Sequence, residues 1–519
     1  GGRRGTMNAA MRRLGWPAVI LALLAGTACG GETKMRQDAT KGGELKTSLL
    51  PSPSSPLVTL RIQFRAGAVD DPAGKEGLNA VTAMTLGQGG TRELTYRQVT
   101  DRLYPMAATI TAQPDREVTT FIGEVHRDHL KDFYQIFADL LLEPRFDPAD
   151  FQRVRDLLVA GIETNLRSND DEELGKEALN ALIYRGHPYG RPDIGTVQGL
   201  KSITLDDVRA CYRRLYTRGD VVIGVAGGYP QGLVDSLKSD LAGLPEGAPE
   251  RKPIPEPAPI DGMHVMIVEK PAPATAISIG RPIDVTRADP DFYALMVAGS
   301  YLGEHRTFNG RLMNVMRAAR GLNYGDYAYI EAFTQDGGST FALPNVPRGR
   351  QLFSIWIRPV APENALFALR QATRELQLLI DNGLSREDFE QSRRFLLNYS
   401  RLWTQSLSRR LGYQLDSLFY GTDFFIDRVQ EELPKLTVEQ VNAAVKRHLD
   451  AKNLDVAIVA TDAAALRDRL LSGRPTPITY QTPTTDEALL KEDAVIQAYP
   501  LPLAKDGVTI VKAQDLFER

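Results

Sequence analysis

Hydrophobic residues follow the period of a β-strand in some segments of the chain and the period of a helix in others. Segment 57–68, LVTLRIQFRAGA, alternates like a half-buried strand, and segment 108–125, ATITAQPDREVTTFIGEV, is typical of a β-hairpin. Hairpins interleaved with helices predict an α+β fold in which a mainly antiparallel sheet is covered by helices. The helical stripe that follows consists of Leu130, Phe133, Phe137, Leu140 and Leu141.

Two further segments predict helices of different character. Segment 77–91, GLNAVTAMTLGQGGT, reads as an apolar helix and contains no His, Glu, Asp or Cys. A longer helix is expected from Pro148, because Pro is favoured in the first turn and Asp147 is placed to cap it. The first of these helices carries no side chain suited to catalysis.

The same pattern occurs twice along the chain. Segment 203–227, ITLDDVRACYRRLYTRGDVVIGVAG, matches segment 436–460, LTVEQVNAAVKRHLDAKNLDVAIVA, and both read as a capped helix, a turn and a buried strand. Segment 146–162 matches segment 384–400 at nearly the same offset. The repeat predicts two homologous units of about 200 residues each.

A proline-rich segment separates the two halves. PEGAPERKPIPEPAP favours extended backbone, so we expect an N-terminal unit at 47–244, a linker at 245–261 and a C-terminal unit at 262–475. The tail, 476–519, is rich in Pro and Thr and then acidic, and its VTIV run predicts an edge strand or a contact with a partner.

The first residues have the pattern of an export signal, which we place at 1–28. A Met-Arg-Arg start precedes the apolar run 16–24, which is too short to span a bilayer as a helix, and small residues follow it. The expected location is the periplasm or cell envelope.

Cys29 directly follows the small residues, as the acylated cysteine does in bacterial lipoproteins. We therefore expect a lipid anchor at Cys29, with ordinary cleavage after Ala28 as the alternative. Segment 29–46 is polar and reads as a tether. The only other cysteine, Cys211, leaves no disulfide framework and is expected to be a buried apolar residue.

The charge balance excludes one class of partner. The chain has 62 basic and 65 acidic residues, well mixed, for a net charge of -3. No electropositive field is available for a phosphate backbone, so a nucleic-acid partner is not expected.

Three segments of the chain carry a shared signal: FRAGAVDDPAGKEGLNA, RGHPYGRPDIGTVQGLKSIT at 185–204 and NGRLMNVMRAARGLNYG at 309–325. Together they resemble the insulinase, pitrilysin and mitochondrial-processing-peptidase family of inverted-motif zinc peptidases. The resemblance runs from about residue 48 to 475 and agrees with the repeat. It implies that the two units form one half of a clamshell.

The resemblance also locates the zinc site of the family on this chain. The family helix carries His-x-x-Glu-His, whose positions fall at Ala80, Ala83 and Met84, and a later Glu ligand falls at Gly161. A slip of one register recruits Glu163, but one carboxylate alone does not hold zinc. The metal site is therefore expected to be degenerate, with no cofactor and no catalytic residue in this chain.

Arg320 and Tyr324 are the candidate substrate-binding residues. In the family an Arg and a Tyr at this spacing face the zinc of the opposing unit and bind the main chain of the substrate. The alternative is a surface turn built on Gly321, Asn323 and Gly325, with Arg320 in an ion pair.

The spacing of Glu124, His126 and His129, E-x-H-x-x-H, raises a second metal possibility. One histidine ends a strand and the other opens a helix, so the pattern matches no helical or hairpin ligand set. We do not expect a metal there.

These inferences favour a non-catalytic subunit of a heterodimeric insulinase-family zinc peptidase. A related partner subunit with an intact motif is expected to supply the zinc, and a peptide or unfolded polypeptide is the expected substrate. The alternatives are a peptidase-like scaffold or peptide-binding protein with no role in proteolysis, and an enzyme with a relocated metal.

Overall fold

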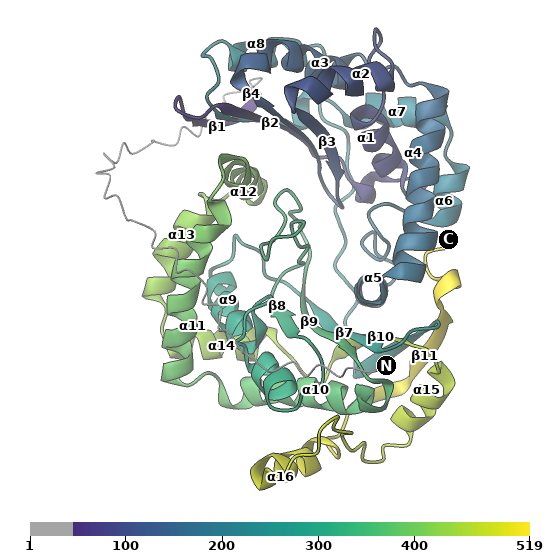
Figure 1. Ribbon diagram of the computed structural model, residues 1–519, viewed down its shortest axis with the longest axis vertical. Coiled ribbons are helices and arrows are strands. Elements are labelled where there is room, and N and C mark those ends of the chain that lie inside the picture. Colours follow the sequence, from purple (N-terminus) through teal and green to yellow (C-terminus); the bar gives the residue numbers. More distant parts are fainter. Residues whose placement is uncertain (1–44) are drawn as a thin grey trace, which may run out of the picture. The chain divides into compact units, whose positions relative to one another are not determined.

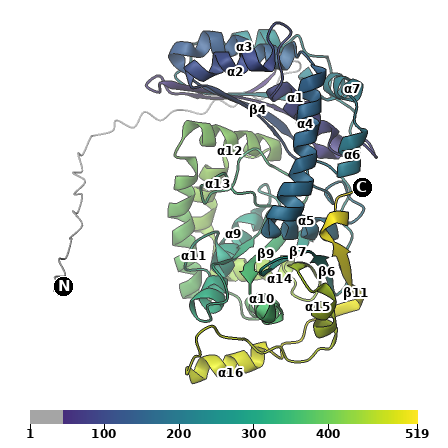
Figure 2. The ribbon, with the colours of Figure 1, turned by 45° about the vertical axis from the view of Figure 1, so that its right-hand side comes forward.

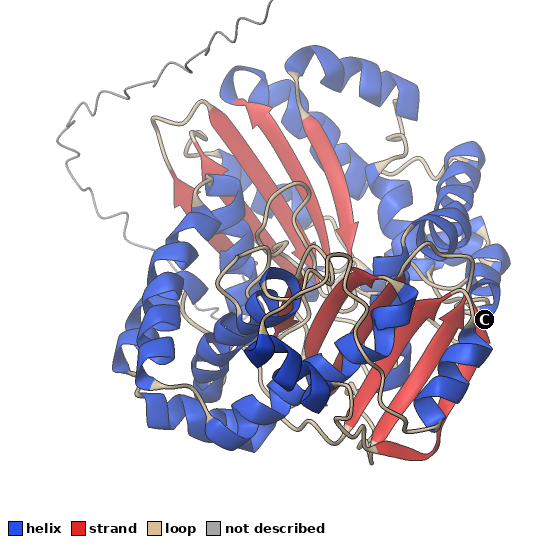
Figure 3. Cartoon of the chain, turned by 60° about the horizontal axis from the view of Figure 1, so that its bottom comes forward, coloured by secondary structure: helices blue, strands red, loops and turns tan. Residues whose placement is uncertain are grey.

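The computed structural model describes residues 45–519, which fold around two β-sheets (Figure 3). The export signal predicted at 1–28, the lipid anchor at Cys29 and nearly all of the tether lie outside the described residues. No helix within the described range is long and apolar enough to cross a membrane.

The first sheet has five strands in the order β1-β5-β2-β4-β3. β1 and β5 pair in parallel, and the other neighbours are antiparallel, including the predicted hairpin of β3 and β4. The strands are β1 (Lys46–Pro51), β2 (Leu57–Phe64), β3 (Thr109–Pro114), β4 (Thr119–His126) and β5 (Val221–Gly227).

The second sheet has six strands in the order β11-β6-β10-β7-β9-β8. β6 pairs in parallel with both β10 and β11, and the remaining pairs are antiparallel. The strands are β6 (Met263–Glu269), β7 (Thr275–Ile283), β8 (Asp326–Tyr329), β9 (Gln351–Val360), β10 (Leu454–Ala460) and β11 (Leu503–Lys512). The predicted α+β class with two similar units is confirmed, and both sheets are mixed.

In the first unit α1 contacts β3, α4 and α7, and α3 contacts β4 (Figure 1). They are α1 (Leu78–Gly87), α2 (Tyr96–Leu103), α3 (Leu130–Leu142), α4 (Pro148–Ala160), α5 (Asp171–Ile183), α6 (Val197–Ser202), α7 (Leu205–Leu215) and α8 (Leu233–Leu241). The Asp147 side chain caps α4 as predicted, accepting the Ala149 N–H at 2.8 Å. α4 then continues as a π-helix, η4 (Gly161–Asn169).

In the second unit α9 contacts β8, α11 and α14. The helices are α9 (Pro290–Gly303), α10 (Ala365–Asn382), α11 (Arg386–Tyr399), α12 (Leu407–Tyr420), α13 (Phe425–Glu432), α14 (Val438–His448), α15 (Ala463–Leu471) and α16 (Glu487–Ile496). Segment 245–261, predicted as the linker, contains no helix or strand.

The predicted repeat is visible in local structure. Thr204 and Asp207 form a capping box at the start of α7, and Thr437 and Gln440 form the same device at the start of α14. A buried strand follows each helix, β5 in the first unit and β10 in the second. Each unit also lends a helix to the other, since α12 packs on β1, β2 and β5 while α5 packs on β6, β7 and β10.

The tail joins both units. Its VTIV run lies in β11, which pairs with β6 at the edge of the second sheet, so the edge-strand prediction is confirmed. The last residues then reach the first unit beside α6 (Figure 2), where the carbonyl oxygens of Phe517 and Glu518 accept the N–H groups of Val197 and Gln198 at 3.0 and 2.8 Å. The tail is therefore part of the folded core.

Candidate functional site

Helix α1 begins from a tightly constrained turn. Gly77 has a φ of 103°, and a Cβ there would lie 2.6 Å from the Ile194 carbonyl oxygen, so glycine is required. The Asp71 carboxylate accepts hydrogen bonds from the N–H groups of Gly77 and Asn79, at 2.8 and 2.7 Å. Burial raises the pKa of the Asp71 carboxyl to about 7, and the two N–H donors act in the opposite direction. The turn fixes the direction of α1.

The predicted metal-ligand positions on α1 carry no group that coordinates zinc. Ala80 and Ala83 are fully buried, and Met84 packs against the same core. A zinc site needs three protein ligands drawn from thiolate, imidazole and carboxylate groups, and alanine offers no lone pair. These residues do not fit a zinc ion, so no hydrolytic step can be derived from this helix.

The predicted third ligand position lies where α4 changes into η4. A Cβ at Gly161 would meet the Ile194 side chain at 3.5 Å, in ordinary apolar contact. The alternative residue, Glu163, forms an ion pair with Lys201 at 3.2 Å and has a side chain 44% exposed. Within residues 45–519, no three side chains among His, Cys, Asp and Glu gather closely enough to hold a metal ion.

Close packing explains what α1 contributes instead. Seen in Figure 1 beside β3, the helix approaches this strand so closely that a Cβ on Gly87 would lie 2.8 Å from the Ala112 Cβ. The Thr82 hydroxyl donates to the Leu78 carbonyl oxygen at 2.8 Å, which satisfies a buried polar group within the helix. The predicted burial of Cys211, on the neighbouring α7, is confirmed. α1 is a structural helix in the core of the first unit.

The Glu124, His126 and His129 side chains have separate partners or solvent. Glu124 accepts a hydrogen bond from the Thr59 hydroxyl at 3.3 Å. His126 ends β4, where its Nδ1 accepts the Asp128 N–H at 3.3 Å, and His129 is exposed in the next turn. This local capping arrangement leaves the two imidazoles without a shared metal position in the described part of the chain.

Arg320 is buried against the tail. Its Nε donates to Asp493 Oδ1 at 2.8 Å, and one terminal nitrogen donates to Glu492 Oε2 at 2.9 Å. The other terminal nitrogen donates to the Val315 carbonyl oxygen at 2.7 Å. Both acids belong to α16, so all these donors are used within the chain.

Tyr324 lies apart from this ion-pair cluster. It is 79% exposed, in a turn where the Asn323 side chain accepts the Gly325 N–H at 3.2 Å. The structure therefore does not bring Arg320 and Tyr324 to one surface. The arrangement matches the alternative of a surface turn with Arg320 in an ion pair, and a substrate role for the two residues stays a prediction.

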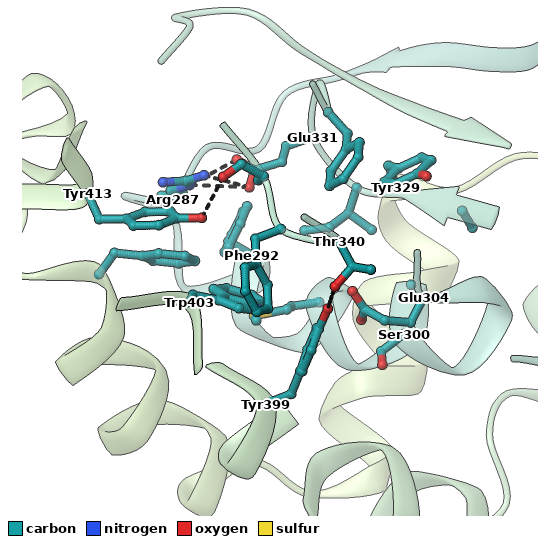
Figure 4. A pocket seen from close by; sticks show the side chains of 18 residues that line it. Arg287, Phe292, Ser300, Glu304, Tyr329, Glu331, Thr340, Tyr399, Trp403 and Tyr413 are labelled. Atoms are coloured by element: carbon teal, nitrogen blue, oxygen red, sulfur yellow. Dashed lines mark hydrogen bonds and ion pairs between the residues drawn. The ribbon is translucent and has the colours of Figure 1, made fainter. Parts of the chain in front are cut away.

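A cavity of about 80 Å³ lies in the second unit, between α9, α11 and the segment that follows β8 (Figure 4). Its lining includes buried apolar residues and half-exposed residues. Arg287 and Glu331 form a forked ion pair in its wall, with N···O distances of 2.9–3.2 Å. The aromatic residues that line it include Phe292, Phe341, Tyr399, Trp403, Tyr413 and Phe425.

Glu304 is the other acidic residue of the cavity wall. The Ser300 hydroxyl and the His305 N–H donate to its carboxylate, and no Lys or Arg of residues 45–519 forms an ion pair with it. Burial raises the pKa of Glu304 to about 7, and the two donors act in the opposite direction. The cavity therefore combines aromatic walls with an acid that has no cation.

Neither the cavity nor the acids that pair with Arg320 could be predicted from the sequence. The lining of the cavity comes from residues more than a hundred positions apart, which no local period connects. The acidic segment of the tail was noticed, but its partner could not be read from spacing. Tyr399 and Trp403, four residues apart, were the one visible signal of a shared aromatic face.

Two sequence profiles of one family match consecutive parts of this chain. The profile described as "Insulinase (Peptidase family M16)" matches residues 47–197, and the one described as "Peptidase M16 inactive domain" matches residues 202–396. The chain belongs to the insulinase family of peptidases and peptidase homologues.

Individual relatives agree with this assignment. The chain is 20% identical over 408 residues to "Non-peptidase homolog YmxG" of Helicobacter pylori. The aligned residues cover 78% of this chain and 89% of that protein. The crystal structure of a peptidase M16 inactive domain from Pseudomonas fluorescens superimposes with a TM-score of 0.72 at 22% identity, covering 82% of this chain and 98% of that one.

A chain of complex III2 from Candida albicans also has this fold. The TM-score is 0.64 at 14% identity, and the match covers 80% of this chain and 93% of that one. The fold therefore occurs both in peptidases and in chains of a multi-subunit assembly.

Proposed function

We propose that this chain is the non-catalytic subunit of a two-chain peptidase of its family. A related subunit with an intact His-x-x-Glu-His supplies the zinc and the general base, and this chain supplies half of the chamber around a peptide or unfolded polypeptide. The pair acts in the periplasm or cell envelope, with this chain anchored through a lipid on Cys29.

One observation carries the proposal. The side chains at Ala80, Ala83 and Met84 are apolar and packed into the core, while the fold around them is that of the peptidase family. A chain that keeps the architecture and lacks the ligands can take part in hydrolysis only through another subunit. The name of the Helicobacter pylori relative, a non-peptidase homolog, supports this view.

Tyr324 is the residue most directly available for substrate. Its exposed hydroxyl can donate to a peptide carbonyl oxygen. Arg320 acts on substrate in this proposal only after leaving its ion pairs with Glu492 and Asp493. Tyr324 is therefore the better residue on which to test the proposed role.

The test is reconstitution with a family member from the same organism that carries the intact zinc motif. We expect the mixture to cleave an unfolded polypeptide at least tenfold faster than either chain alone, because the closed chamber holds the substrate at the metal. Tyr324→Phe should reduce this gain, and Tyr104→Phe, which alters another exposed tyrosine, should not. Equal rates with and without this chain would refute the proposal.

The buried state of Arg320 favours a second candidate, a peptidase-like scaffold that binds peptides or other chains without proteolysis. All of the described guanidinium contacts are structural, as expected if substrate binding had been lost. Under this alternative the chain still binds its partner, but neither its addition nor Tyr324→Phe changes the cleavage rate. Co-purification measured beside the rates separates the two candidates.

A further inference from the structure

The cavity in the second unit borders α9, the helix whose packing corresponds to that of α1 in the first unit. α1 packs on α4 and α7, and α9 packs on α11 and α14, which are the helices matched by the sequence repeat. Aligning the last residues of α1 and α9 places Met296, Gly299 and Ser300 at the positions of Ala80, Ala83 and Met84. All three of these α9 residues line the cavity. The face of the helix that is filled in the first unit is therefore open in the second.

The walls of this cavity suit a ligand with an apolar body. Phe292, Tyr413 and Phe425 are buried residues of its lining, and Tyr399 and Trp403 are half-exposed. Aromatic faces of this kind attract cations as well as apolar chains. The Arg287 guanidinium is already matched by Glu331, so it leaves little net positive charge to repel a cation.

Glu304 supplies the polar end. Its carboxylate lies on the cavity side of α9 near the hydrogen-bonded Thr340 and Tyr399 hydroxyls (Figure 4), and no cation of the described chain pairs with it. An ionised carboxylate in an aromatic cavity is costly without a partner, and a ligand ammonium group provides one. The volume of about 80 Å³ is several times the 10–15 Å³ or so that one water needs, so the cavity has room for a small ligand group.

We propose that this cavity binds the side chain of a peptide lysine, with the methylene chain against the aromatic rings and the ammonium group on Glu304. The inference rests on the proposed function only in taking the ligand to be part of a peptide. The cavity then serves as a specificity pocket in a chain whose described residues include no zinc site.

The test is calorimetric titration of the purified full-length chain with two blocked pentapeptides, acetyl-Gly-Ala-Lys-Ala-Gly-amide and its norleucine counterpart. Norleucine keeps the alkyl chain and removes the charge. The lysine peptide should bind at least tenfold more tightly, since hydrogen bonds to charged groups are worth about a factor of ten or more.

Three variants locate the binding. Glu304→Gln should abolish the preference for lysine, and Glu431→Gln, an exposed acid outside the cavity, should leave it unchanged. Ala342→Phe fills the cavity and should weaken the binding of both peptides at least tenfold. Circular dichroism of each variant verifies that it is folded.

The pH dependence provides an independent readout. The pKa of Glu304 is raised to about 7, so the lysine peptide should bind more tightly at pH 8 than at pH 6. The groups that face Glu304 do not titrate in this window, because burial raises the pKa of Tyr329 and Tyr399 and lowers the pKa of His305 to about 4. The Arg287–Glu331 pair also lines the cavity, and the Arg306 guanidinium acts on the neighbouring His305 and Tyr329. The norleucine peptide should show no such dependence.

Equal affinity for the two peptides, no binding of either, or a lysine preference that survives Glu304→Gln or Ala342→Phe would each overturn the inference. These titrations need no partner subunit. A failed reconstitution of proteolysis therefore leaves this result standing, and a failed titration leaves the proposed subunit role standing.

Discussion

Arg320 and Asp493 form a buried ion pair across 173 residues of sequence, with the guanidinium Nε 2.8 Å from the carboxylate Oδ1. This contact joins the segment before β8 to the tail helix α16. Glu492 and Arg374 extend it into a network on α10, since both Arg320 and Arg374 contact the Glu492 carboxylate. Arg320 therefore links the segment before β8 to the tail, and its role toward substrate stays a prediction.

Arg320→Met should destabilise the protein by about 3–5 kcal/mol, because Asp493 would remain buried without its cation. Arg317→Met, which removes a half-exposed arginine nearby, should cost much less. Urea unfolding of both variants measures the difference. If Arg320→Met unfolds at the same urea concentration as the parent, the ion pair does not stabilise the fold and a substrate role gains support.

Gly87→Ala tests the packing of α1 against β3. The added Cβ would meet Ala112 Cβ at 2.8 Å and its backbone nitrogen at 3.1 Å, so we expect a loss of about 1–3 kcal/mol. Gly232→Ala serves as the control, since an added Cβ there meets no atom within 4 Å. Denaturant unfolding reports both. A neutral or stabilising Gly87→Ala would mean that α1 is loosely held.

Phe517→Ala should weaken the attachment of the tail to the first unit. Phe517 is 7% exposed, and the neighbouring Leu516 carbonyl oxygen accepts a hydrogen bond from Arg167 Nε at 2.8 Å. Truncating a buried phenylalanine costs about 3–5 kcal/mol. Phe308→Ala, at a site 69% exposed, should have a small effect. In Phe517→Ala, amide hydrogen exchange should speed up in α6 and η4. Unchanged exchange there would contradict the structural role of the tail.

Glu304 should make stability depend on pH in the absence of ligand. Its pKa is raised from 4.5 to about 7 in the folded protein, so between these values the folded state holds a proton that the unfolded chain has released. The contribution of Glu304 is therefore fully present below about pH 4.5 and is lost as the pH rises to about 7. Compared with Glu304→Gln, the free energy of unfolding of the parent should fall across this window. Above it, the free energies of unfolding of the two proteins should change with pH in parallel. If the free energies of unfolding of the parent and of Glu304→Gln differ by the same amount at pH 5, 6 and 7, the pKa of Glu304 is not raised.

The parts of the fold that sequence predicted are those controlled by local chemistry. The capping residues Thr204 and Thr437, the hairpin at 108–125 and the stripe on α3 follow from short-range spacing, and each was found at its expected place. Repetition of such local signals was enough to predict two similar units. The absence of metal ligands in segment 77–91 also follows from the sequence, because it depends on residue types alone.

Contacts between distant segments could not be predicted in this way. Arg320 has an obvious charge, but nothing near it in sequence indicated that Glu492 and Asp493 would cover it. The cavity could not be predicted for the same reason, because Glu304 and Trp403 come to line one cavity only after α9 and α11 have packed.

The proposed role depends on the absence of a hydrolytic metal site from residues 45–519. The most direct test is to purify it to homogeneity, measure its zinc content by mass spectrometry and assay cleavage of an unfolded polypeptide with and without a chelator. We predict far less than one zinc per chain and no chelator-sensitive cleavage. Stoichiometric zinc together with cleavage that a chelator abolishes would contradict the account.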